Sequence, residues 1–503
     1  MHFERNIEMK SLLRRRIVTA ILYLSTIKAT IRKMSRKKGP LPYIESLEIE
    51  DYAAEGKALG HFDGMVVFVA GAVPGDVAEV QVTKQHRRFM EGRIVSLIQK
   101  SECREEPRCP HFGICGGCKW QNLPYQSQLN YKRRQVEDQL VRIGKLSVPE
   151  INLCLGSDEI YWYRNKLEYS FSPQRWLTYE EIKQQEVLDK RPALGFHVPN
   201  VFDKALDISV CFLQRDPSNA IRDFIKEFTI SNQYTFYDSR AHEGLMREII
   251  IRTSSTGEVM LSVVFAYKDS EKIRALLDAV KEKFPQVTSL YYFINEKWND
   301  SLSDQTPILY FGKEYMEERM EDLTFRISPK SFYQTNSEQA LRLYTKAREM
   351  AELRPTDTLY DLYTGTGTIA NFCARQCKKV IGIEYVEDAI LDARINSSAN
   401  GIDNTEFFAG DMKKVLNRDF IRLHGKADVM IVDPPRAGMD KDVVDVIMEA
   451  SPERIVYVSC NPATQARDLA LLAPKYDILE VQPVDMFPHT QHVENIVKLK
   501  LKA

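Results

Sequence analysis

A cysteine late in the chain has the surroundings of a nucleophile. Residues 455–468 read I-V-Y-V-S-C-N-P-A-T-Q-A-R-D, so Cys460 is predicted to end a buried strand just before a helix. A cysteine within a core strand usually serves as a small apolar side chain. Cys460 instead stands at the strand end, beside Asn461 and Pro462. Because a thiolate presented at such an edge can attack a substrate, this position favours nucleophilic catalysis.

Carboxylates stand at two further strand boundaries. Residues 431–438 read I-V-D-P-P-R-A-G and place Asp433 at the carboxyl end of a buried strand, where open α/β sheets bind their ligands. Near the C-terminus, P-H-T-Q-H-V-E-N-I-V brings His489, His492 and Glu494 to the start of the last strand. Their spacing differs from the helical H-E-x-x-H motif, so we do not expect a zinc site there.

A glycine turn predicts a nucleoside pocket. Residues 358–370 read T-L-Y-D-L-Y-T-G-T-G-T-I-A, a buried strand that runs through Gly365 and Gly367 into a helix. The next strand ends at Glu384, where a carboxylate can accept both ribose hydroxyls. The loop lacks the third glycine of the dinucleotide motif and no phosphate-binding lysine follows, so S-adenosylmethionine fits better than NAD or ATP. Asp411, after the third strand, is either an adenine contact or an ordinary polar loop residue.

The cysteines suggest a metal-binding loop in a reducing compartment. Their odd number and scattered positions argue against a disulfide framework and fit the cytoplasm. One C-x₂-C pair with a single cysteine upstream matches an iron–sulfur loop better than the paired motifs of zinc ribbons. Iron–sulfur, zinc and unligated thiols remain open, and the fourth ligand could be Cys103, Cys154 or Cys211. The nine cysteines are Cys103, Cys109, Cys115, Cys118, Cys154, Cys211, Cys373, Cys377 and Cys460.

Composition excludes several classes of protein. The 503 residues are 44% hydrophobic and 28% charged, as in soluble globular proteins, and are too many for one core. No stretch reaches the roughly 20 apolar residues that span a bilayer, which excludes an integral membrane protein. The net charge of −1 gives no overall sign of a nucleic-acid partner. An RNA-binding protein of this composition would have to concentrate its cations in patches.

The first 40 residues differ from the rest. They contain eleven Lys and Arg residues against two Glu. The basic and apolar runs resemble a signal peptide, but no small-residue cleavage site follows. We expect residues 1–40 to be a disordered extension or a mis-annotated start, with Met34 as the true start. A helix that binds RNA or a membrane surface is the alternative.

The remaining pattern divides the chain into three units. Residues 41–101 alternate apolar and polar positions between glycines, which predicts an OB-like β-barrel, a fold often used for oligonucleotides. Residues 102–330 mix strands and helices around the cysteine-rich loop and indicate an α+β domain. Residues 331–503 alternate buried strands with helices and predict a doubly wound, Rossmann-like α/β domain. The expected strands are 46–49, 65–69, 78–82, 248–253, 259–264, 289–293, 359–362, 380–383, 429–432 and 454–458, and the expected helices of the middle domain are 218–227 and 270–283.

Taken together, these motifs resemble the RNA uracil-5-methyltransferases, and within them the 23S ribosomal RNA branch. The resemblance extends over nearly everything after residue 40. Residues 41–101 resemble the family's TRAM domain, and Cys109–Cys118 resemble its iron–sulfur loop. The methyltransferase signatures are matched by Ser328–Asn336 (S-P-K-S-F-Y-Q-T-N), Asp361–Gly367, Asp433–Gly438, Ser459–Pro462 and His492–Glu494.

The resemblance implies roles for individual residues. Cys460 would be the nucleophile and Glu494 the proton acceptor. Two features depart from the family: Thr364 stands where a cysteine is common, which we expect to matter little, and residues 1–40 have no counterpart. The implied ligands of a 4Fe-4S cluster are Cys109, Cys115, Cys118 and Cys211. The implied contacts to S-adenosylmethionine are Gln334, Tyr363, Glu384 and Asp433, with Asp411 as a further candidate.

These roles define a covalent reaction. C5 of uracil is a poor nucleophile toward a methyl sulfonium, and addition of the Cys460 thiolate to C6 turns it into an enolate that can attack. Glu494 would then remove the C5 proton, so that Cys460 is eliminated. Because C6 is unreachable in a duplex, the target base should be flipped or lie in a loop. No step needs redox chemistry, so we expect the cluster to be structural.

Two other functions remain as alternatives. The tripeptide D-P-P also suggests an adenine-N6 methyltransferase, although such enzymes have an aromatic residue where this chain has Arg436. A non-catalytic RNA-binding or assembly factor would not require Cys460 or Glu494. We expect a cytoplasmic monomer, without a membrane or obligate protein partner, that methylates a uridine of 23S rRNA. A tRNA substrate remains open.

Overall fold

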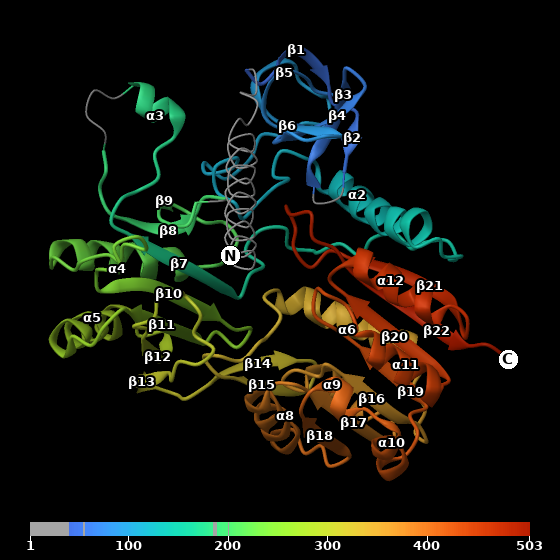
Figure 1. Ribbon diagram of the computed structural model, residues 1–503. Coiled ribbons are helices and arrows are strands. Elements are labelled where there is room, and N and C mark those ends of the chain that lie inside the picture. Colours follow the sequence, from blue (N-terminus) through green and yellow to red (C-terminus); the bar gives the residue numbers. More distant parts are fainter. Residues whose placement is uncertain (1–39, 54–55, 185–188, 200) are drawn as a thin grey trace, which may run out of the picture.

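The computed structural model describes residues 40–53, 56–184, 189–199 and 201–503. The prediction for the N-terminal extension concerns residues that, apart from residue 40, lie outside these ranges. In Figure 1 the N-terminal sheet lies at the top, the central sheet at the left and the C-terminal sheet at the lower right. No helix within the described residues is long and apolar enough to span a bilayer.

The N-terminal unit is a six-stranded sheet with the strand order β1-β5-β6-β4-β3-β2. Apolar and polar side chains alternate along its strands: Ala78, Val80 and Val82 are buried on one face of β5. The expected strands 65–69 and 78–82 lie within β4 and β5, and the expected strand 46–49 overlaps β1, which begins three residues earlier and ends one residue earlier. The strands are β1 (Tyr43–Glu48), β2 (Asp51–Tyr52), β3 (Ala58–Phe62), β4 (Met65–Ala70), β5 (Val77–Gln85) and β6 (Phe89–Gln99).

The central unit is a seven-stranded mixed sheet with the order β13-β12-β11-β10-β7-β8-β9. The apolar face of this sheet packs in one core cluster with helices α4 and α5, which confirms the α+β prediction. The predicted helix 270–283 has the bounds of α5. The elements are β7 (Lys166–Ser172), α3 (Tyr179–Gln184), β8 (Ala193–His197), β9 (Ala205–Asp207), α4 (Ser218–Ser231), β10 (Met246–Thr253), β11 (Val259–Phe265), α5 (Ser270–Lys283), β12 (Val287–Ile294) and β13 (Ile308–Gly312).

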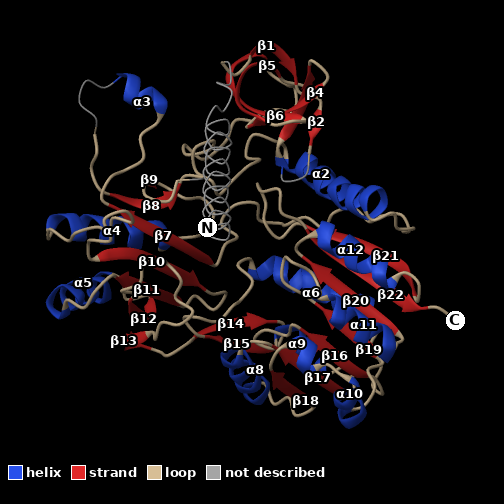
Figure 2. Cartoon of the chain, in the orientation of Figure 1, coloured by secondary structure: helices blue, strands red, loops and turns tan. Residues whose placement is uncertain are grey.

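The C-terminal unit is the predicted doubly wound α/β domain. Its sheet has the order β18-β17-β16-β19-β20-β22-β21, and helices flank both faces (Figure 2). The strands are β16 (Thr358–Leu362), β17 (Lys379–Glu384), β18 (Thr405–Ala409), β19 (Val429–Val432), β20 (Arg454–Ser459), β21 (Tyr476–Val484) and β22 (Glu494–Leu501). The helices are α6 (Ser337–Ala351), α7 (Thr368–Ala374), α8 (Glu387–Ala399), α9 (Met412–Val415), α10 (Arg418–His424), α11 (Lys441–Ala450) and α12 (Pro462–Leu472).

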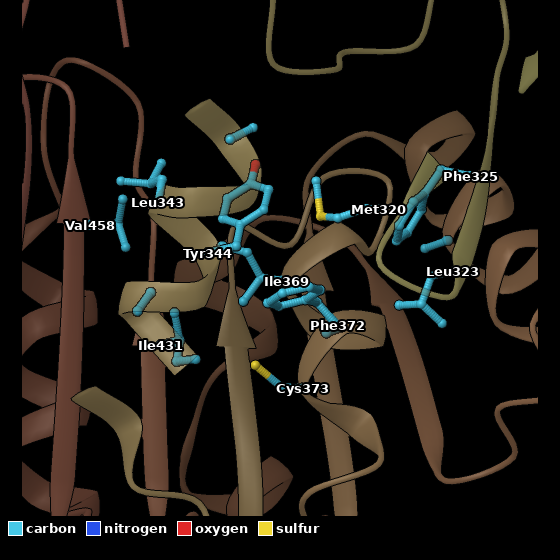
Figure 3. Packing of buried hydrophobic residues seen from close by; sticks show 14 of the residues in the cluster. Met320, Leu323, Phe325, Leu343, Tyr344, Ile369, Phe372, Cys373, Ile431 and Val458 are labelled. Atoms are coloured by element: carbon cyan, nitrogen blue, oxygen red, sulfur yellow. The ribbon is translucent and has the colours of Figure 1, made fainter. Parts of the chain in front are cut away.

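A hairpin that precedes this domain in sequence packs into its core. The hairpin consists of β14 (Met316–Met320) and β15 (Leu323–Ile327). Figure 3 shows its side chains converging with those of α6, α7 and the sheet strands on one cluster. Asn396 of α8 and Asn400, the C-cap residue of that helix, accept hydrogen bonds from the backbone of β15 at 2.9 and 2.8 Å. The hairpin is therefore part of the C-terminal core, upstream of the boundary expected at residue 330.

A second upstream segment covers the other face of the same sheet. It contains α2 (Tyr125–Glu137) and the π-helix η2 (Asp138–Ile143). Val136 and Leu140 are fully buried in the cluster that includes the strands β16, β17 and β20. Leu155 then forms a parallel bridge with Val484 at the end of β21. The segment after the cysteine-rich loop thus links the N-terminal half of the chain to the C-terminal sheet.

Candidate functional site

The carboxyl edge of the C-terminal sheet gathers the candidate cofactor residues. Strands β18, β17, β16, β19 and β20 run parallel, so the residues that follow each strand meet at one edge. The strand order reverses between β16 and β19, and open α/β sheets bind ligands at such a reversal. Tyr363 follows β16, Asp433 follows β19 and Glu384 ends β17. These three residues therefore lie at the same edge of the sheet, beside the reversal of strand order.

The last strand brings Glu494 next to Cys460. Strand β22 runs antiparallel to β20, and their register pairs Asn495 with Ser459. Glu494 begins β22 and Cys460 directly follows β20, so both residues lie at the carboxyl edge. The two side chains proposed for catalysis are thus neighbours across the ladder, although 33 positions separate them in the sequence.

Asn461 fixes the turn that presents Cys460. Its side chain accepts a hydrogen bond from the backbone N–H of Ala463 (3.2 Å) and so caps helix α12. Its Nδ2 donates to the carbonyl of Arg436 at 3.0 Å. This second bond joins the loop after β20 to the loop after β19, which carries Asp433. The polar residue beside the cysteine therefore links the two candidate strand ends.

Burial and mutual repulsion control the protonation of this site. Burial, followed by the charge of Asp433, raises the pKa of Glu494 to about 8, and Arg436 opposes this shift. Burial also raises the pKa of Asp433 to about 7. Burial and then the charges of Glu494 and Asp433 raise the pKa of the Cys460 thiol to about 11, again against Arg436. A carboxylate titrating near neutral pH is well suited to accept a proton, whereas the thiol requires activation.

The glycine turn after β16 has the backbone conformation that the sequence predicts. Tyr363, Gly365 and Gly367 all have positive φ, at 66°, 55° and 74°. A Cβ on Gly367 would lie 2.8 Å from the Cβ of Ala393, so only glycine fits there. The Glu384 carboxylate accepts a hydrogen bond from the N–H of Gly365 at 3.2 Å. That bond holds the carboxylate against the turn, where a ribose would approach.

A buried carboxylate under this turn escaped the sequence reading. Asp361 is fully buried in β16, and its Oδ2 accepts a hydrogen bond from the Thr364 hydroxyl at 2.5 Å. Burial raises the pKa of Asp361 to about 7, although this hydrogen bond opposes the shift. A thiol is a much weaker donor than a hydroxyl. The threonine at position 364 therefore has a structural role that the family comparison did not suggest.

Gln334 joins the central sheet to the cofactor crevice. Its carbonyl accepts a hydrogen bond from the side chain of Asn165 at 2.8 Å, directly before β7. Its side chain forms a hydrogen bond with the hydroxyl of Tyr344 on α6. Burial, followed by the charge of Asp433, raises the pKa of that hydroxyl. Gln334 thus lies beside the pocket residues although it is distant from them in sequence. Asp411 instead caps α9 by accepting from the N–H of Lys413 at 3.2 Å, and its adenine contact stays a prediction.

The loop before Glu494 is held by buried groups of α2, which the sequence reading also missed. Lys132 and Asp485 form an ion pair at 2.5 Å with both side chains fully buried. Lys132 also donates to the carbonyl of Phe487 at 3.1 Å. The Gln128 amide accepts from the N–H of His489 at 2.8 Å. Nothing in the pattern of α2 marked Gln128 or Lys132, because polar residues on a helix usually face solvent.

The four cysteines implied as cluster ligands line one cavity. Cys109, Cys115, Cys118 and Cys211 all border a space of about 320 Å³. Gln121 accepts the backbone N–H of Cys109 at 3.0 Å, and Asn219 accepts that of Cys211 at 2.9 Å. Cys103 is exposed and Cys154 is buried, and neither borders this space. Of the three cysteines considered for the fourth position, Cys211 alone shares this cavity with Cys109, Cys115 and Cys118.

Among the described residues, no group of three or more His, Cys, Asp or Glu side chains is placed to hold a metal ion. This result includes the four cysteines and also the triad of His489, His492 and Glu494. That the triad binds no zinc stays a prediction, which rests on the spacing of its residues. For the cysteines the metal stays a prediction, since it rests on the shared cavity and not on a preformed coordination geometry.

Comparisons with known proteins agree with this architecture. A family model described as tRNA (uracil-5-)-methyltransferase matches residues 302–502, and a TRAM domain model matches residues 45–95. An RNA methyltransferase of Porphyromonas gingivalis is 56% identical over 90% of this chain and 99% of its own, and one of Chlorobaculum tepidum is 39% identical over 90% and 95%. The solved structure of the Pyrococcus abyssi tRNA (uracil-54, C5)-methyltransferase, in complex with S-adenosyl-L-homocysteine, covers 90% of this chain and 100% of its own at 28% identity, with a TM-score of 0.70.

Proposed function

Since the chain belongs to the uracil-5-methyltransferase family of RNA methyltransferases, which use S-adenosylmethionine, we propose that it methylates C5 of a specific uridine through Cys460 and Glu494. The observation that carries this proposal is the register of β20 and β22. It makes Cys460 and Glu494 neighbours at the edge where the cofactor crevice opens. An adenine-N6 methyltransferase would need neither residue.

The two side chains divide the reaction between them. The Cys460 thiolate forms a bond to C6 of uracil, and the C5=C6 electron pair moves into the O4 enolate. S-adenosylmethionine would supply an electrophilic methyl group. The enolate would form the C5–CH3 bond as the S–CH3 bond breaks, and S-adenosylhomocysteine would leave as a neutral thioether. Glu494 then accepts the C5 proton, the C5=C6 double bond re-forms and the bond from C6 to Cys460 breaks. The thiolate is regenerated, and the net change is replacement of one proton by a methyl group.

The electrostatics of the site determine which step needs help. With a pKa of about 11, only about one Cys460 in a thousand is a thiolate at pH 8. Arg436 is the group of this chain that favours the thiolate, and its backbone is tied to Asn461 beside the nucleophile. Glu494, with a pKa of about 8, is a stronger base than an ordinary carboxylate. We infer that Arg436 assists addition and that the high pKa of Glu494 assists proton removal.

We propose that the cofactor occupies the crevice at the strand-order reversal. Glu384 would accept the ribose hydroxyls, since its carboxylate already lies against the glycine turn. Tyr363, Asp433 and Gln334 would complete the pocket from β16, β19 and the segment before α6. Asp411 would bind the adenine. These assignments rest on position along one sheet edge and on the family resemblance.

We propose that Cys109, Cys115, Cys118 and Cys211 hold a 4Fe-4S cluster whose role is structural. Such a group would tie the cysteine-rich loop to the segment before α4, which supplies Cys211. No step of methyl transfer requires an electron. We place the protein in the cytoplasm, because the odd number and scattered positions of its nine cysteines argue against a disulfide framework.

The proposed substrate is 23S rRNA, with the target uridine flipped or in a loop. The similar solved structure is named as a tRNA enzyme, so tRNA is the alternative to be tested. The experiment maps 5-methyluridine in 23S rRNA and in tRNA from a strain that lacks the gene and from its parent. Loss from one position of 23S rRNA is expected. Loss confined to tRNA would reassign the substrate, and no loss from either would refute uracil-C5 methylation.

A further inference from the structure

An exposed arginine beside the cysteine-rich loop rests on three aromatic rings. The guanidinium carbon of Arg108 lies 4.6 Å from the ring centroid of Phe212, 5.2 Å from that of Tyr161 and 5.6 Å from that of Trp162. Within the described part of the chain, no carboxylate pairs with this guanidinium. An arginine stacked on aromatic faces keeps its N–H donors free at the edge of its plane. Arg108 is thus a cation that is held by aromatic rings and is neutralised by no carboxylate of the described residues.

The rings beneath Arg108 form a fixed platform. Trp162 and Phe212 meet edge to face at 5.3 Å, and Tyr161 and Phe212 do so at 6.4 Å. The backbone N–H of Trp162 donates a hydrogen bond to the backbone carbonyl of Phe212 at 2.7 Å. Trp162 has a φ of 61°, a strained conformation that is rare for a bulky residue. Such strain persists only where the surrounding contacts determine the conformation, and it is frequent at binding sites.

This platform adjoins the loop that leads to Glu494. The ring of Tyr161 lies 4.4 Å from that of His489. The next residue but one, Tyr163, donates its hydroxyl to the carbonyl of Pro488 at 3.1 Å. The platform and the candidate proton acceptor are therefore attached to the same short segment. A strand of RNA whose uridine enters the site would pass close to Arg108.

We infer that Arg108, backed by Tyr161, Trp162 and Phe212, binds a phosphodiester of the RNA strand next to the target uridine. This inference rests on the proposed function for the identity of the target. The planar guanidinium of Arg108 is exposed and has no carboxylate partner among the described residues, and its N–H donors can match the two oxygens of a phosphate. Extrusion of a base loses stacking and pairing energy, so the backbone beside it must be held. The platform supplies that contact within the reach of the catalytic loop.

Phosphate binding can be tested without knowledge of the target sequence, because a phosphate contact weakens binding to all sequences alike. The probe is a fluorescent 12-nucleotide oligouridylate, titrated with the protein at several KCl concentrations. Arg108→Ala should weaken binding about tenfold and lower the slope of log Kd against log salt by about 0.7. Arg108→Lys keeps the positive charge but removes the planar pair of guanidinium N–H donors. It should therefore preserve the salt slope and still weaken oligouridylate binding.

Two further variants separate binding from folding. Arg422→Ala removes an arginine whose side chain is 83% exposed on α10, and it should leave both affinity and slope unchanged. Trp162→Gly removes a platform ring at a residue whose positive φ suits glycine. It should weaken oligouridylate binding at least threefold. If Arg108→Ala fails to fold, Arg108→Lys and Trp162→Gly decide the question.

The outcomes distinguish this inference from the proposed function. If Arg108→Ala binds oligouridylate with wild-type affinity and salt slope, and the wild-type protein makes 5-methyluridine, the phosphate-binding inference is refuted and the proposed function stands. Wild-type affinity in both Arg108→Lys and Trp162→Gly would overturn it as well. Weakened binding in Arg108→Ala, in a protein that makes no 5-methyluridine, would support the platform and refute the function. S-adenosylhomocysteine binding should stay unchanged in all three variants.

Discussion

Replacing Glu494 by Gln should separate the two halves of the reaction. Glutamine has nearly the same shape but cannot accept the C5 proton, so the enzyme should add Cys460 to C6, transfer the methyl group and then stop. A denaturant-resistant protein–RNA adduct should accumulate with substrate RNA and S-adenosylmethionine. Cys460→Ala should bind RNA and form no adduct. Both variants should lose turnover, for different reasons.

The same substitution should make Cys460 more reactive. Glu494 is the nearby charge that raises the pKa of the thiol most, after burial itself. Glutamine removes that charge, so the pKa of Cys460 should fall from about 11. Each unit of decrease raises the thiolate fraction about tenfold. Glu494 is almost fully ionised at pH 9.5 and about half protonated at pH 8. We therefore expect Glu494→Gln to speed alkylation of Cys460 by iodoacetamide by between threefold and tenfold at pH 9.5, and by at most about twofold at pH 8.

The variant should also change how stability depends on pH. The pKa of Glu494 is raised from 4.5 to about 8 on folding, so between these values the folded state holds a proton that the unfolded state has released. Wild-type stability therefore falls as the pH rises through this window, and glutamine abolishes that loss. The full shift corresponds to at most about 5 kcal/mol. In denaturant unfolding, the free energy of unfolding of Glu494→Gln should therefore rise relative to that of the wild type as the pH increases from 5 to 8.

The control is Glu453→Gln, which alters an exposed carboxylate at the opposite end of β20. It should change neither thiol reactivity nor the dependence of stability on pH. An adduct in Cys460→Ala would refute the nucleophile. Absence of the adduct from folded, RNA-bound Glu494→Gln would remove Glu494 from the mechanism. Unfolding of Glu494→Gln, or its failure to bind RNA, would show a structural carboxylate instead.

Three further predictions follow from the structure. Lys132→Met should lower the free energy of unfolding by about 3–5 kcal/mol in urea, because Asp485 is left buried without its partner, whereas Lys441→Met at an exposed ion pair should stay within about 0.5 kcal/mol. Thr364→Val should weaken S-adenosylhomocysteine binding in calorimetry by threefold or more, because Asp361 loses its hydroxyl donor, and Thr364→Ser should restore it; equal affinities would contradict the role of this bond. Anaerobically purified protein should be brown with about four iron and four sulfide per chain, and Cys211→Ser but not Cys154→Ser should bleach it; stoichiometric zinc without iron would overturn the cluster.

The C-terminal fold could be read from the sequence because buried parallel strands are continuous apolar runs. The segments 359–362, 380–383, 429–432 and 454–458 all lie within strands β16, β17, β19 and β20. The ends of those runs then located Glu384, Asp433 and Cys460 at one sheet edge. The direction of the last strand is not contained in such a pattern. The position of Glu494 beside Cys460 follows only from the antiparallel pairing of β22.

Residues that act from a distance in sequence could not be found in this way. Gln128 and Lys132 lie on a helix of low hydrophobicity and are nevertheless fully buried, because their partners come from residues 485–489. A polar helical residue is normally interpreted as solvent-exposed. Asp361 was overlooked for a related reason, since a carboxylate within an apolar strand gives no signal of its hydrogen bond to Thr364. Pairwise contacts between distant segments decide these cases.

The loop from Asp485 to His489 shows why the catalytic edge needs the rest of the chain. Helix α2 supplies the cation that neutralises Asp485, and the end of the cysteine-rich loop donates two backbone N–H groups, of Lys119 and Trp120, to the carbonyl of His489 at 2.8 and 3.0 Å. The segment before β7 adds the bond from Tyr163 to Pro488. In an isolated C-terminal domain, Asp485 would lack its ion pair with Lys132. The loop would also lose its hydrogen bonds to Lys119, Trp120 and Tyr163. The geometry that places Glu494 is therefore built by residues that precede it by more than 300 positions.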